Sequence, residues 1–429
     1  IYTMLSYSGF EDCYVTTKGA KYAYPSTANL IVGNAGTSGI CRAFMRVNNL
    51  PTISSANTIV SAKLHYYCEF SSSVPGEVQT NLYKVTASTV RDYSLISWNN
   101  QPGYDSQALD IKINSRRKMG YNIFDITRAA RDWYAGEINN GLLFKSIDES
   151  TYCWYYYYAK ENSGNNRYPK LEIFYVHTNG LEDCWDYSSQ NMGRAGTAYV
   201  QDFTGNFLMS RTDMSYGGSR MPVSIGFSYS LSDRATDIGY GYGWRTNYAQ
   251  TLESCTISSI NYYRWTDGDG TEKYFYKDTD NVWKDELGYG YTLTIGNDSA
   301  AKYTIKDKKD NEMVFNSVGR LVTVRDAFGN AISITHDSAG QITGVTDGAG
   351  RHYTFAYTNS RLSLLTYTGV GSTPLETVSY TYTSDGDLAS VTYYDNETAL
   401  YEWTTGHVMS AARDIDQTGG RDQLTVACY

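Results

Sequence analysis

Residues 319–330 read Gly-Arg-Leu-Val-Thr-Val-Arg-Asp-Ala-Phe-Gly-Asn, and residues 340–351 read Gly-Gln-Ile-Thr-Gly-Val-Thr-Asp-Gly-Ala-Gly-Arg, an interval of 21 residues. The two copies match position by position in their glycines, apolar residues and Asp-x-x-Gly anchors. Such an interval indicates a repeat array. After each anchor a run of period two predicts a half-buried strand. We therefore expect each unit to be a turn and two short strands.

The Asp-x-x-Gly anchors have a local physical explanation. Asp can hydrogen-bond its own backbone two residues on, and Gly takes a positive φ angle without Cβ strain. Weaker copies extend the array through residues 267–270, 307–310 and 385–386. We assign the following anchor residues to structural turns: Asp267, Gly270, Asp326, Gly329, Asp347 and Gly350. One hairpin cannot bury its own apolar face, so neighbouring hairpins must stack into a continuous sheet.

These motifs resemble the YD repeat of RHS proteins over about residues 250–429. The resemblance implies a coiled β-sheet shell, which encloses a C-terminal toxin in bacterial members and forms an extracellular barrel in animal teneurins. The chain opens at Ile1 and stops at Tyr429 inside the array, so we expect a fragment whose partners include its own downstream repeats and a C-terminal domain. Few repeats leave an exposed sheet edge near residues 401–429, through which copies could self-associate.

Residues 1–176 follow a different pattern. Apolar residues alternate in Ala62-x-Leu64-x-Tyr66, and Ser, Gly and Asn turns separate such segments, which predicts a β-sandwich. One short helix interrupts it: Asp125 can cap the helix, Trp133 lies on its apolar face and Gly136 ends it. The predicted fold class is all-β, a sandwich followed by a sheet of repeat hairpins.

Four motifs in this region carry a second resemblance. They are Ile96–Pro102, Phe124–Thr127, Asn140–Leu142 and Pro169–Ile173, in that order. This succession resembles a DNRLRE domain. The resemblance implies a jelly-roll-like β-sandwich of secreted bacterial proteins, some members of which resemble carbohydrate-binding modules.

A connecting module separates the two regions. Gly180-Leu-Glu-Asp-Cys-Trp185 and Gly239-Tyr-Gly-Tyr-Gly-Trp244 are similar to the segment that precedes YD repeats in secreted, wall-associated RHS proteins of Gram-positive bacteria. The glycines of the second motif predict a close-packed strand beside Trp244, because no strand-then-helix context supports a nucleotide loop. We expect three domains, at residues 1–176, 177–250 and 251–429.

Composition and charge limit the partners. The chain has 42 Tyr, 7 Pro and 19% charged residues, which suits a β-rich extracellular protein. Residues 1–175 hold 17 Lys+Arg and 14 Asp+Glu, a balance of +3, whereas the rest hold 19 and 31, a balance of −12. An acidic repeat region argues against nucleic acid as a partner. No run of about 18 apolar residues suggests a membrane span. We expect a secreted protein at the bacterial cell surface.

Patterns of catalytic and metal sites were not found. The sequence has no G-x-S-x-G elbow, H-E-x-x-H or P-loop, and its five histidines share no motif, so we expect neither an enzyme nor a cofactor. Seven cysteines lack metal spacing; buried free thiols are favoured over one or two disulfides. Two acidic stretches, Asp267–Gly270 and Asp278–Asn281, could offer oxygens to calcium but lack the bidentate Glu of a full calcium loop.

One stretch suggests a ligand surface, residues 152–160, Tyr-Cys-Trp-Tyr-Tyr-Tyr-Tyr-Ala-Lys. Side chains of a strand alternate between faces. We expect Trp154, Tyr156, Tyr158 and Lys160 on the outer face, and the intervening tyrosines in the core. Outward rings could stack on the apolar face of a sugar, so cell-wall or extracellular polysaccharide is the expected ligand. The alternative is that both faces are buried, one by the opposing sheet and one by the neighbouring domain.

Two functions follow from these observations. In the first, the chain is the non-catalytic part of a secreted RHS protein, whose surface-binding module precedes a shell for a C-terminal toxin. In the second, it belongs to an adhesin or a structural, fibre-forming protein without a toxin. Residues after Tyr429 would distinguish the two.

Overall fold

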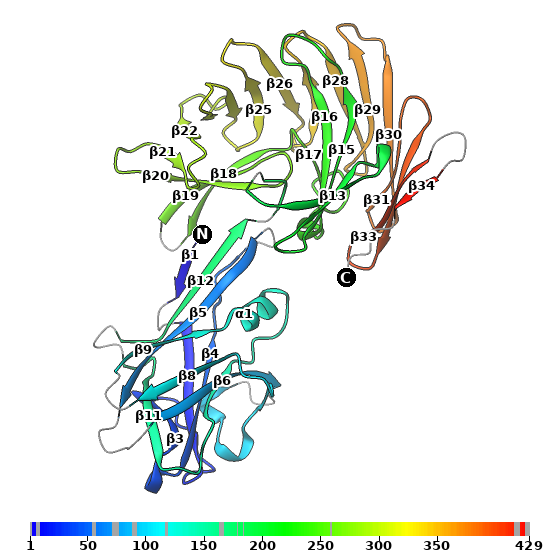
Figure 1. Cartoon of the computed structure of the whole chain (residues 1–429). Coiled ribbons are helices and arrows are strands. Elements are labelled where there is room, and N and C mark those ends of the chain that lie inside the picture. The colour runs from blue at the N-terminus through cyan, green and yellow to red at the C-terminus, as the bar shows by residue number, and fades with distance from the viewer. Residues whose placement is uncertain are drawn as a thin grey trace. The chain divides into compact units, whose positions relative to one another are not determined.

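A computed structural model describes residues 2–5, 9–53, 57–70, 77–87, 92–115, 119–162, 167–177, 179–182, 184–257, 260–415 and 421–424. The chain divides into two compact units, Ile1–Val176 and His177–Tyr429, which are treated separately below as unit 1 and unit 2 (Figure 1). Antiparallel strands are the main regular structure of both units, so the all-β prediction is confirmed.

Unit 1 contains twelve strands in one branched ladder. The strands are β1 (Tyr2–Leu5), β2 (Phe10–Thr16), β3 (Asn29–Asn34), β4 (Ile40–Val47), β5 (Asn57–Phe70), β6 (Glu77–Ala87), β7 (Gly103–Tyr104), β8 (Asp110–Ser115), β9 (Gly120–Asp125), β10 (Leu142–Ser146), β11 (Cys153–Tyr158) and β12 (Lys170–His177). The ladder runs β1-β12-β5-β11-β3-β4-β10-β6-β7, while β2 pairs with β4, β8 with β6 and β9 with β5.

The ladder of unit 1 folds over on itself. Strands β5 and β10 are separated by three strands in the ladder, yet the ring centroids of Tyr66 and Phe144 lie only 5.1 Å apart. Phe124 of β9 lies 5.2 Å from the same Phe144 ring. All three rings are fully buried. Two parts of the ladder, β5 with β9 on one side and β10 on the other, therefore face each other across one aromatic core, as the layers of a sandwich do.

The one α-helix of the described residues is α1 (Thr127–Tyr134). Trp133 is buried in the core, and Gly136 takes a φ of +103° just after the helix. The predicted cap differs in one detail, because Ile126 is the N-cap residue and its side chain makes no capping bond. Asp125 instead accepts a hydrogen bond from the N–H of Thr127 at 2.8 Å, which makes a turn ahead of the helix.

Unit 2 is built from two sheets. The smaller contains β13 (Tyr187–Asn191), β14 (Thr197–Gln201), β15 (Phe207–Ser215), β16 (Ser224–Ser230) and β17 (Trp244–Thr246) in sequence order. The larger contains β18 (Thr251–Ile257), β19 (Ile260–Thr266), β20 (Glu272–Lys277), β21 (Trp283–Asp285), β22 (Thr292–Ile295), β23 (Tyr303–Lys306), β24 (Glu312–Phe315), β25 (Leu321–Arg325), β26 (Ala331–His336), β27 (Ile342–Thr346), β28 (His352–Thr358), β29 (Arg361–Gly369), β30 (Glu376–Tyr382), β31 (Leu388–Thr392), β32 (Thr398–Thr404), β33 (Val408–Ile415) and β34 (Arg421–Leu424). Each of its strands pairs with the next along the chain.

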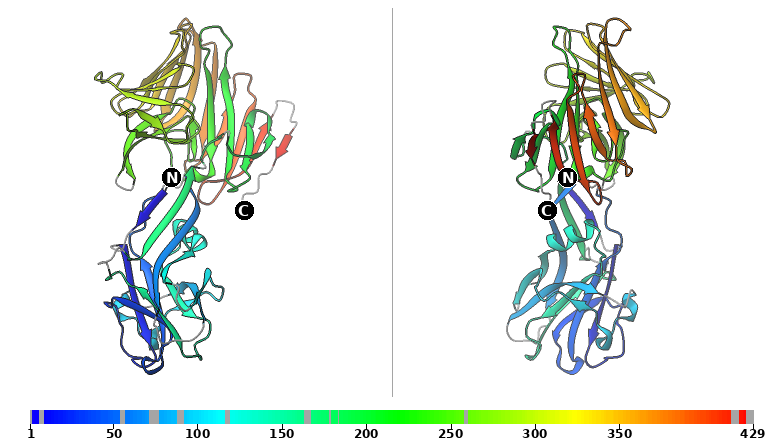
Figure 2. Two further views of the ribbon diagram at one scale, coloured as in Figure 1. Left: turned by 60° about the vertical axis from the view of Figure 1, so that its left-hand side comes forward. Right: turned by 90° about the vertical axis from the view of Figure 1, so that its right-hand side faces the viewer.

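Side chains from both sheets share the core of unit 2, and Figure 2 shows the smaller sheet in green beside the strands of the larger one. Arg211 of β15 is buried at the centre with a side-chain exposure of 2%, and its Nε lies 2.9 Å from Asp213 Oδ1. Its guanidinium carbon lies 4.2 Å from the Trp244 ring centroid. Burial disfavours the charged arginine, but Asp213 outweighs it and the pKa of Arg211 is raised.

The Asp-x-x-Gly turns of the larger sheet share one hydrogen-bond pattern. Asp326 Oδ1 accepts the N–H groups of Phe328 and Asn330, both at 2.9 Å, and Oδ2 accepts the Asn330 side chain at 2.7 Å. Gly329 has a φ of +87°. These bonds, first among them that of the Asn330 side chain, lower the pKa of Asp326. Asp347 makes the corresponding bonds 21 residues later.

A seam joins the start of the larger sheet to a later turn. The N–H of Leu252 in β18 donates to Gly319 O at 2.8 Å, and the N–H of Leu321 donates to Gln250 O at 3.2 Å. The contact involves the turn between β24 and β25, at the end of those strands. The sheet is not a closed barrel.

Three further expectations can be compared with the fold. The segment from Gly239 to Gly243 is a loop and not a strand, because its three glycines have φ angles of 104°, 90° and 75° and β17 begins only at Trp244. Six cysteines of the described part are free thiols: Cys13, Cys41, Cys68, Cys153, Cys184 and Cys255. Cys428 lies outside the described residues. So do residues 425–429, and the predicted sheet edge therefore stays a prediction.

Candidate functional site

The candidate site is the outer face of the sheet around β11 in unit 1. Side chains of β11 alternate: Tyr155 and Tyr157 are fully buried, whereas Trp154 and Tyr156 are half-buried. The Tyr157 hydroxyl accepts a hydrogen bond from Asn114 Nδ2 at 3.0 Å. The inward tyrosines thus have polar partners within the core and belong to the structure of the unit.

Two neighbouring strands extend the row of rings. Tyr156 lies opposite Glu69 of β5 and Tyr67 lies opposite Tyr121 of β9, so these four side chains share one face. We call Trp154, Tyr156, Tyr158, Tyr67 and Tyr121 the aromatic face. Centroid distances are 4.6 Å for Trp154–Tyr156, 5.1 Å for Tyr67–Tyr158 and 5.4 Å for Tyr67–Tyr121.

Charged side chains border the aromatic face. The guanidinium carbon of Arg167 lies 4.6 Å from the Tyr67 ring centroid, and Lys170 Nζ lies 5.2 Å from that of Tyr121. Glu69 accepts a hydrogen bond from the Tyr158 hydroxyl. Burial raises the pKa of Tyr121, so its phenol stays protonated at neutral pH, and it donates a hydrogen bond to Tyr168 O at 3.3 Å. The face therefore combines ring surface with hydrogen-bond donors and acceptors.

Two expected members of the face differ from Trp154 and Tyr156. Tyr158 is only 8% exposed, because its ring packs on Tyr67 and its hydroxyl is bound to Glu69. Lys160 lies beyond the end of β11: its N–H donates to Asp12 Oδ2 at 3.0 Å and its ammonium lies 3.8 Å from Glu161.

Tyr67 and Tyr121 were missed by sequence reasoning. A signal for Tyr67 did exist, because the inward alternation of Ala62, Leu64 and Tyr66 places the odd-numbered residues of the same strand on the outer face. Nothing in the sequence shows that β9 pairs with β5, so Tyr121 could not be placed beside Tyr67.

The acidic stretch at Asp267 forms a hydrogen-bonded turn. Asp267 Oδ2 lies 2.7 Å from Lys273 Nζ, and Asp269 Oδ2 accepts the N–H of Leu181 at 2.7 Å. Burial, followed by the neighbouring Asp269, raises the pKa of Asp267 to about 8. In the part of the chain that the structure describes, no group of three or more His, Cys, Asp or Glu side chains is placed to hold a metal ion.

Comparison with protein families assigns three parts of the chain. Residues 4–175 match carbohydrate-binding module family 96, residues 199–275 match a domain of unknown function (DUF6531), and residues 315–352 match the RHS repeat. The DNRLRE resemblance itself stays a prediction. Among the described residues, no helix is long and apolar enough to cross a membrane.

Curated relatives match over a short length. The chain is 28% identical over 144 residues to the tRNA nuclease WapA of Bacillus subtilis (strain 168), which is 34% of this chain and 6% of that protein. The tRNA(Glu)-specific nuclease WapA of Bacillus subtilis subsp. natto (strain BEST195) matches with the same identity and coverage.

Among solved structures, the crystal structure of TcdB2-TccC3-Cdc42 matches with a TM-score of 0.23 and 13% identity, covering 53% of this chain and 13% of that chain. The family matches and the stacked repeat hairpins are consistent with a carbohydrate-binding protein of the RHS-repeat type, as the sequence resemblance implies.

Proposed function

We propose that unit 1 binds an extracellular or cell-wall polysaccharide through the aromatic face. The observation that carries the proposal is the set of rings on one face, the Trp154–Tyr156 pair and the Tyr158–Tyr67–Tyr121 group, in a segment that matches a carbohydrate-binding family. A sugar ring has an apolar C–H face that stacks on aromatic side chains and hydroxyls that need polar partners. Trp154 and Tyr156 supply the stacking surface, because they are the more exposed rings of β11.

The polar contacts come from the border of the face. Glu69 can accept hydrogen bonds from sugar hydroxyls, and Arg167 can donate them. Tyr158 holds Glu69 in place through its hydroxyl. We assign Lys160 a role at the end of the face, where its ammonium can reach a bound chain that extends past β11. This gives Trp154, Tyr156, Tyr158 and Lys160 distinct roles in one site.

The test measures binding of the whole 429-residue chain to insoluble polysaccharides, including purified Gram-positive cell wall and cellulose, in a depletion assay. We expect Trp154→Ala and Tyr156→Ala each to weaken binding about tenfold, which corresponds to about 1.4 kcal/mol. Trp154→Phe should retain most of the affinity, because a ring remains at that position.

Tyr22→Ala is the matched control, since Tyr22 is a tyrosine of the same unit that is 68% exposed and lies outside the aromatic face. It should bind like the unaltered chain. Circular dichroism checks that each variant is folded. Unchanged binding by folded Trp154→Ala and Tyr156→Ala chains would remove the aromatic face from the proposal.

For unit 2 we propose a scaffold role in a secreted, cell-surface RHS protein, in which the repeat sheet begins a shell around a C-terminal toxin. We divide the chain into residues 1–176, 177–250 and 251–429. The second boundary is supported by the change of sheet between β17, which ends at Thr246, and β18, which starts at Thr251. The matched relatives are named tRNA nucleases, and the chain spans 6% of their length.

An adhesin without a toxin is the second candidate, favoured by the same polysaccharide-binding module. The two candidates differ in what the intact natural protein does to a neighbouring cell. A toxin protein should inhibit a competitor strain in co-culture, and loss of the region after residue 429 should abolish inhibition but not wall binding. An adhesin should support attachment of its own cells and leave competitor growth unchanged.

A further inference from the structure

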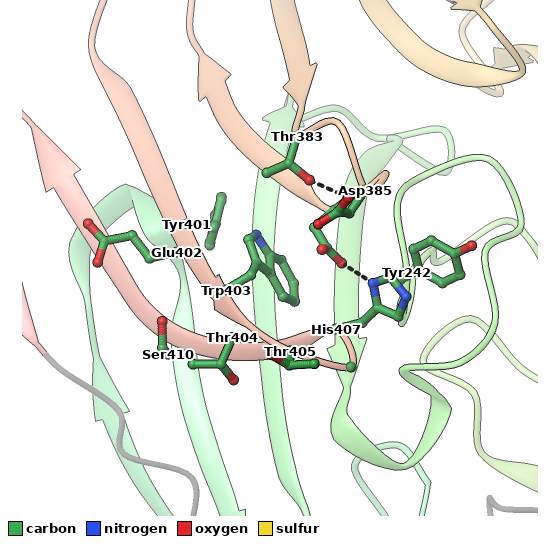
Figure 3. Close-up of a pocket in the computed structure, with 12 residues that line it drawn as sticks. Tyr242, Thr383, Asp385, Tyr401, Glu402, Trp403, Thr404, Thr405, His407 and Ser410 are labelled. Carbon is green, nitrogen blue, oxygen red and sulfur yellow. Dashed lines mark hydrogen bonds and ion pairs between the residues drawn. The ribbon is translucent and has the colours of Figure 1, made fainter.

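A cavity of about 940 Å³ lies in unit 2 beside the turns that precede β31 and β33 (Figure 3). Its lining includes the rings of Tyr242 and Trp403, the carboxylates of Asp385 and Asp387, and the imidazole of His407. Figure 3 shows the Trp403 ring between Asp385 and the loop at Thr404 and Thr405. None of the lining residues is a lysine or an arginine. Aromatic surface and carboxylates in one cavity suit a cation.

Earlier turns on the same side of the sheet show which side chain lies between one turn and the next. The residue after the turn at Gly319 is Arg320, whose guanidinium lies against Gly340 of the next turn on that side. Arg361 lies in the same way against Gly386, 5.8 Å from the Tyr382 ring centroid. Each glycine leaves room that a Cβ would fill. Between these turns the chain provides its own guanidinium to the neighbouring turn.

Between the two turns at the cavity, those at Gly386 and His407, the side chain at this position has the opposite charge. The residue after Gly386 is Asp387, so a carboxylate stands where Arg320, Gln341 and Arg361 stand in the three preceding turns on this side. His407 occupies the turn position of Gly319, Gly340 and Gly386, which is Ser360 in a further turn, and like Ser360 it holds a φ of +63°. A residue with a Cβ is strained at such an angle, and this kind of strain is often associated with function.

His407 is fixed from two sides. Its Nδ1 lies 2.8 Å from Asp387 Oδ1, and its ring stacks on Tyr242 with centroids 3.7 Å apart. Asp387 is only 4% exposed. When Nδ1–H donates to Asp387, Nε2 of the neutral imidazole is left as a hydrogen-bond acceptor. The cavity then offers an acceptor nitrogen beside the exposed carboxylate of Asp385.

We propose that this cavity binds an arginine or lysine side chain presented by a basic polypeptide segment. The incoming cation replaces the one that earlier repeats supply in cis. Trp403 and Tyr242 provide ring surface, and Asp385 provides the opposite charge. The acidic balance of the surrounding unit, 19 Lys+Arg against 31 Asp+Glu after residue 175, favours the approach of a basic segment.

The test titrates the whole chain with the peptide acetyl-Arg-Arg-Arg-amide by isothermal titration calorimetry. The isosteric citrulline peptide has the same shape without the charge, and we expect it to bind at least tenfold more weakly. Asp385→Asn should weaken binding of the arginine peptide about tenfold. His407→Gly, which introduces the glycine found at this position in three other turns, should weaken it as well by removing the acceptor nitrogen.

Asp280→Asn is the matched control, because Asp280 is an exposed carboxylate of the same sheet outside the cavity. It should leave the affinity unchanged. Equal weakening by Asp280→Asn would show diffuse charge attraction and overturn the proposal. Equal binding of the citrulline peptide would also overturn it, as would Asp385-dependent binding of chito-oligosaccharides in the absence of peptide binding.

Discussion

In unit 1 the rings of Tyr67, Tyr121 and Tyr156 lie on the outer face of a sheet, whereas in unit 2 Tyr380 and Tyr393 turn their hydroxyls inward to Asp213, at 2.8 and 3.2 Å. Tyrosine suits both places because it has an apolar body and a polar tip. What differs is the location of the polar partner. In unit 2 both hydroxyls bond to Asp213, which belongs to a buried ion pair. In unit 1 the charged groups of Arg167 and Lys170 lie at the border of the aromatic face, and its rings stay only half-buried.

The largest effect is expected from removing the inner cation. Arg211→Met leaves Asp213 buried without its ion pair and should destabilise unit 2 by about 3–5 kcal/mol. Hydrogen exchange of β15 and β30, measured by mass spectrometry on the whole chain, reports this loss. Arg167→Met removes a cation from the aromatic face of unit 1, where solvent screens it, and should cost less than about 1 kcal/mol. Equal losses in the two variants would contradict the comparison.

A smaller, pH-dependent effect is expected in unit 1. Burial raises the pKa of Asp12 on β2 from 3.8 to about 7. The folded state therefore keeps the proton to higher pH than the unfolded state, and unit 1 should lose stability as pH rises from about 4 to about 7. The loss is on the order of 4 kcal/mol, at roughly 1.4 kcal/mol for each pKa unit. Urea unfolding at several pH values in this range measures the loss of stability, and hydrogen exchange of β2 and β4 is the signal that reports on unit 1.

Asp12→Asn should flatten that pH dependence, and a slope that survives the substitution would assign it to another group. The turn carboxylate of Asp326 in unit 2 provides the opposite sign. Hydrogen bonds lower the pKa of Asp326, so its contribution is present above its ordinary pKa and is lost as pH falls. The two units should thus respond to acid in opposite directions at these positions.

The smallest difference is expected between two glycines of the larger sheet. Gly319 and Gly329 have φ angles of +78° and +87°, so alanine is strained at both. A Cβ at Gly319 would also meet the carbonyl of Leu252 across the seam, whereas at Gly329 nothing lies within 4 Å. We expect Gly319→Ala to cost about 1–2 kcal/mol more than Gly329→Ala in thermal unfolding, by analogy with overpacking. Equal costs would mean that the seam tolerates a Cβ.

Local chemistry explains which features could be predicted from the sequence. The turn at Asp326 uses partners within four residues, so its spacing is visible in the chain. Alternation likewise predicts that Tyr155 and Tyr157 are buried, because period two needs no knowledge of the neighbouring strand. The all-β class follows from many such short segments.

Features that depend on contacts between residues distant in sequence could not be predicted from the sequence. Tyr158 is buried by Tyr67 and Glu69, which are about 90 residues away in sequence. The Gly239–Gly243 loop was mistaken for a strand because glycine is compatible with close packing and with positive φ alike. The cavity at His407 arises from pairing between two turns, and the His407–Asp387 contact joins residues 20 positions apart that only the stacking of the turns brings together.

At the seam, β18 contacts the turn at Gly319, which lies at the end of β24 and β25. The two long edges of β25 stay paired with β24 and β26. A ring that joins edge to edge has a fixed number of strands. A ribbon that meets its own beginning end-on has no such number, so strands can be added one after another without altering those already laid down. Gain or loss of hairpins after β25 can therefore change the length of the sheet without changing the seam.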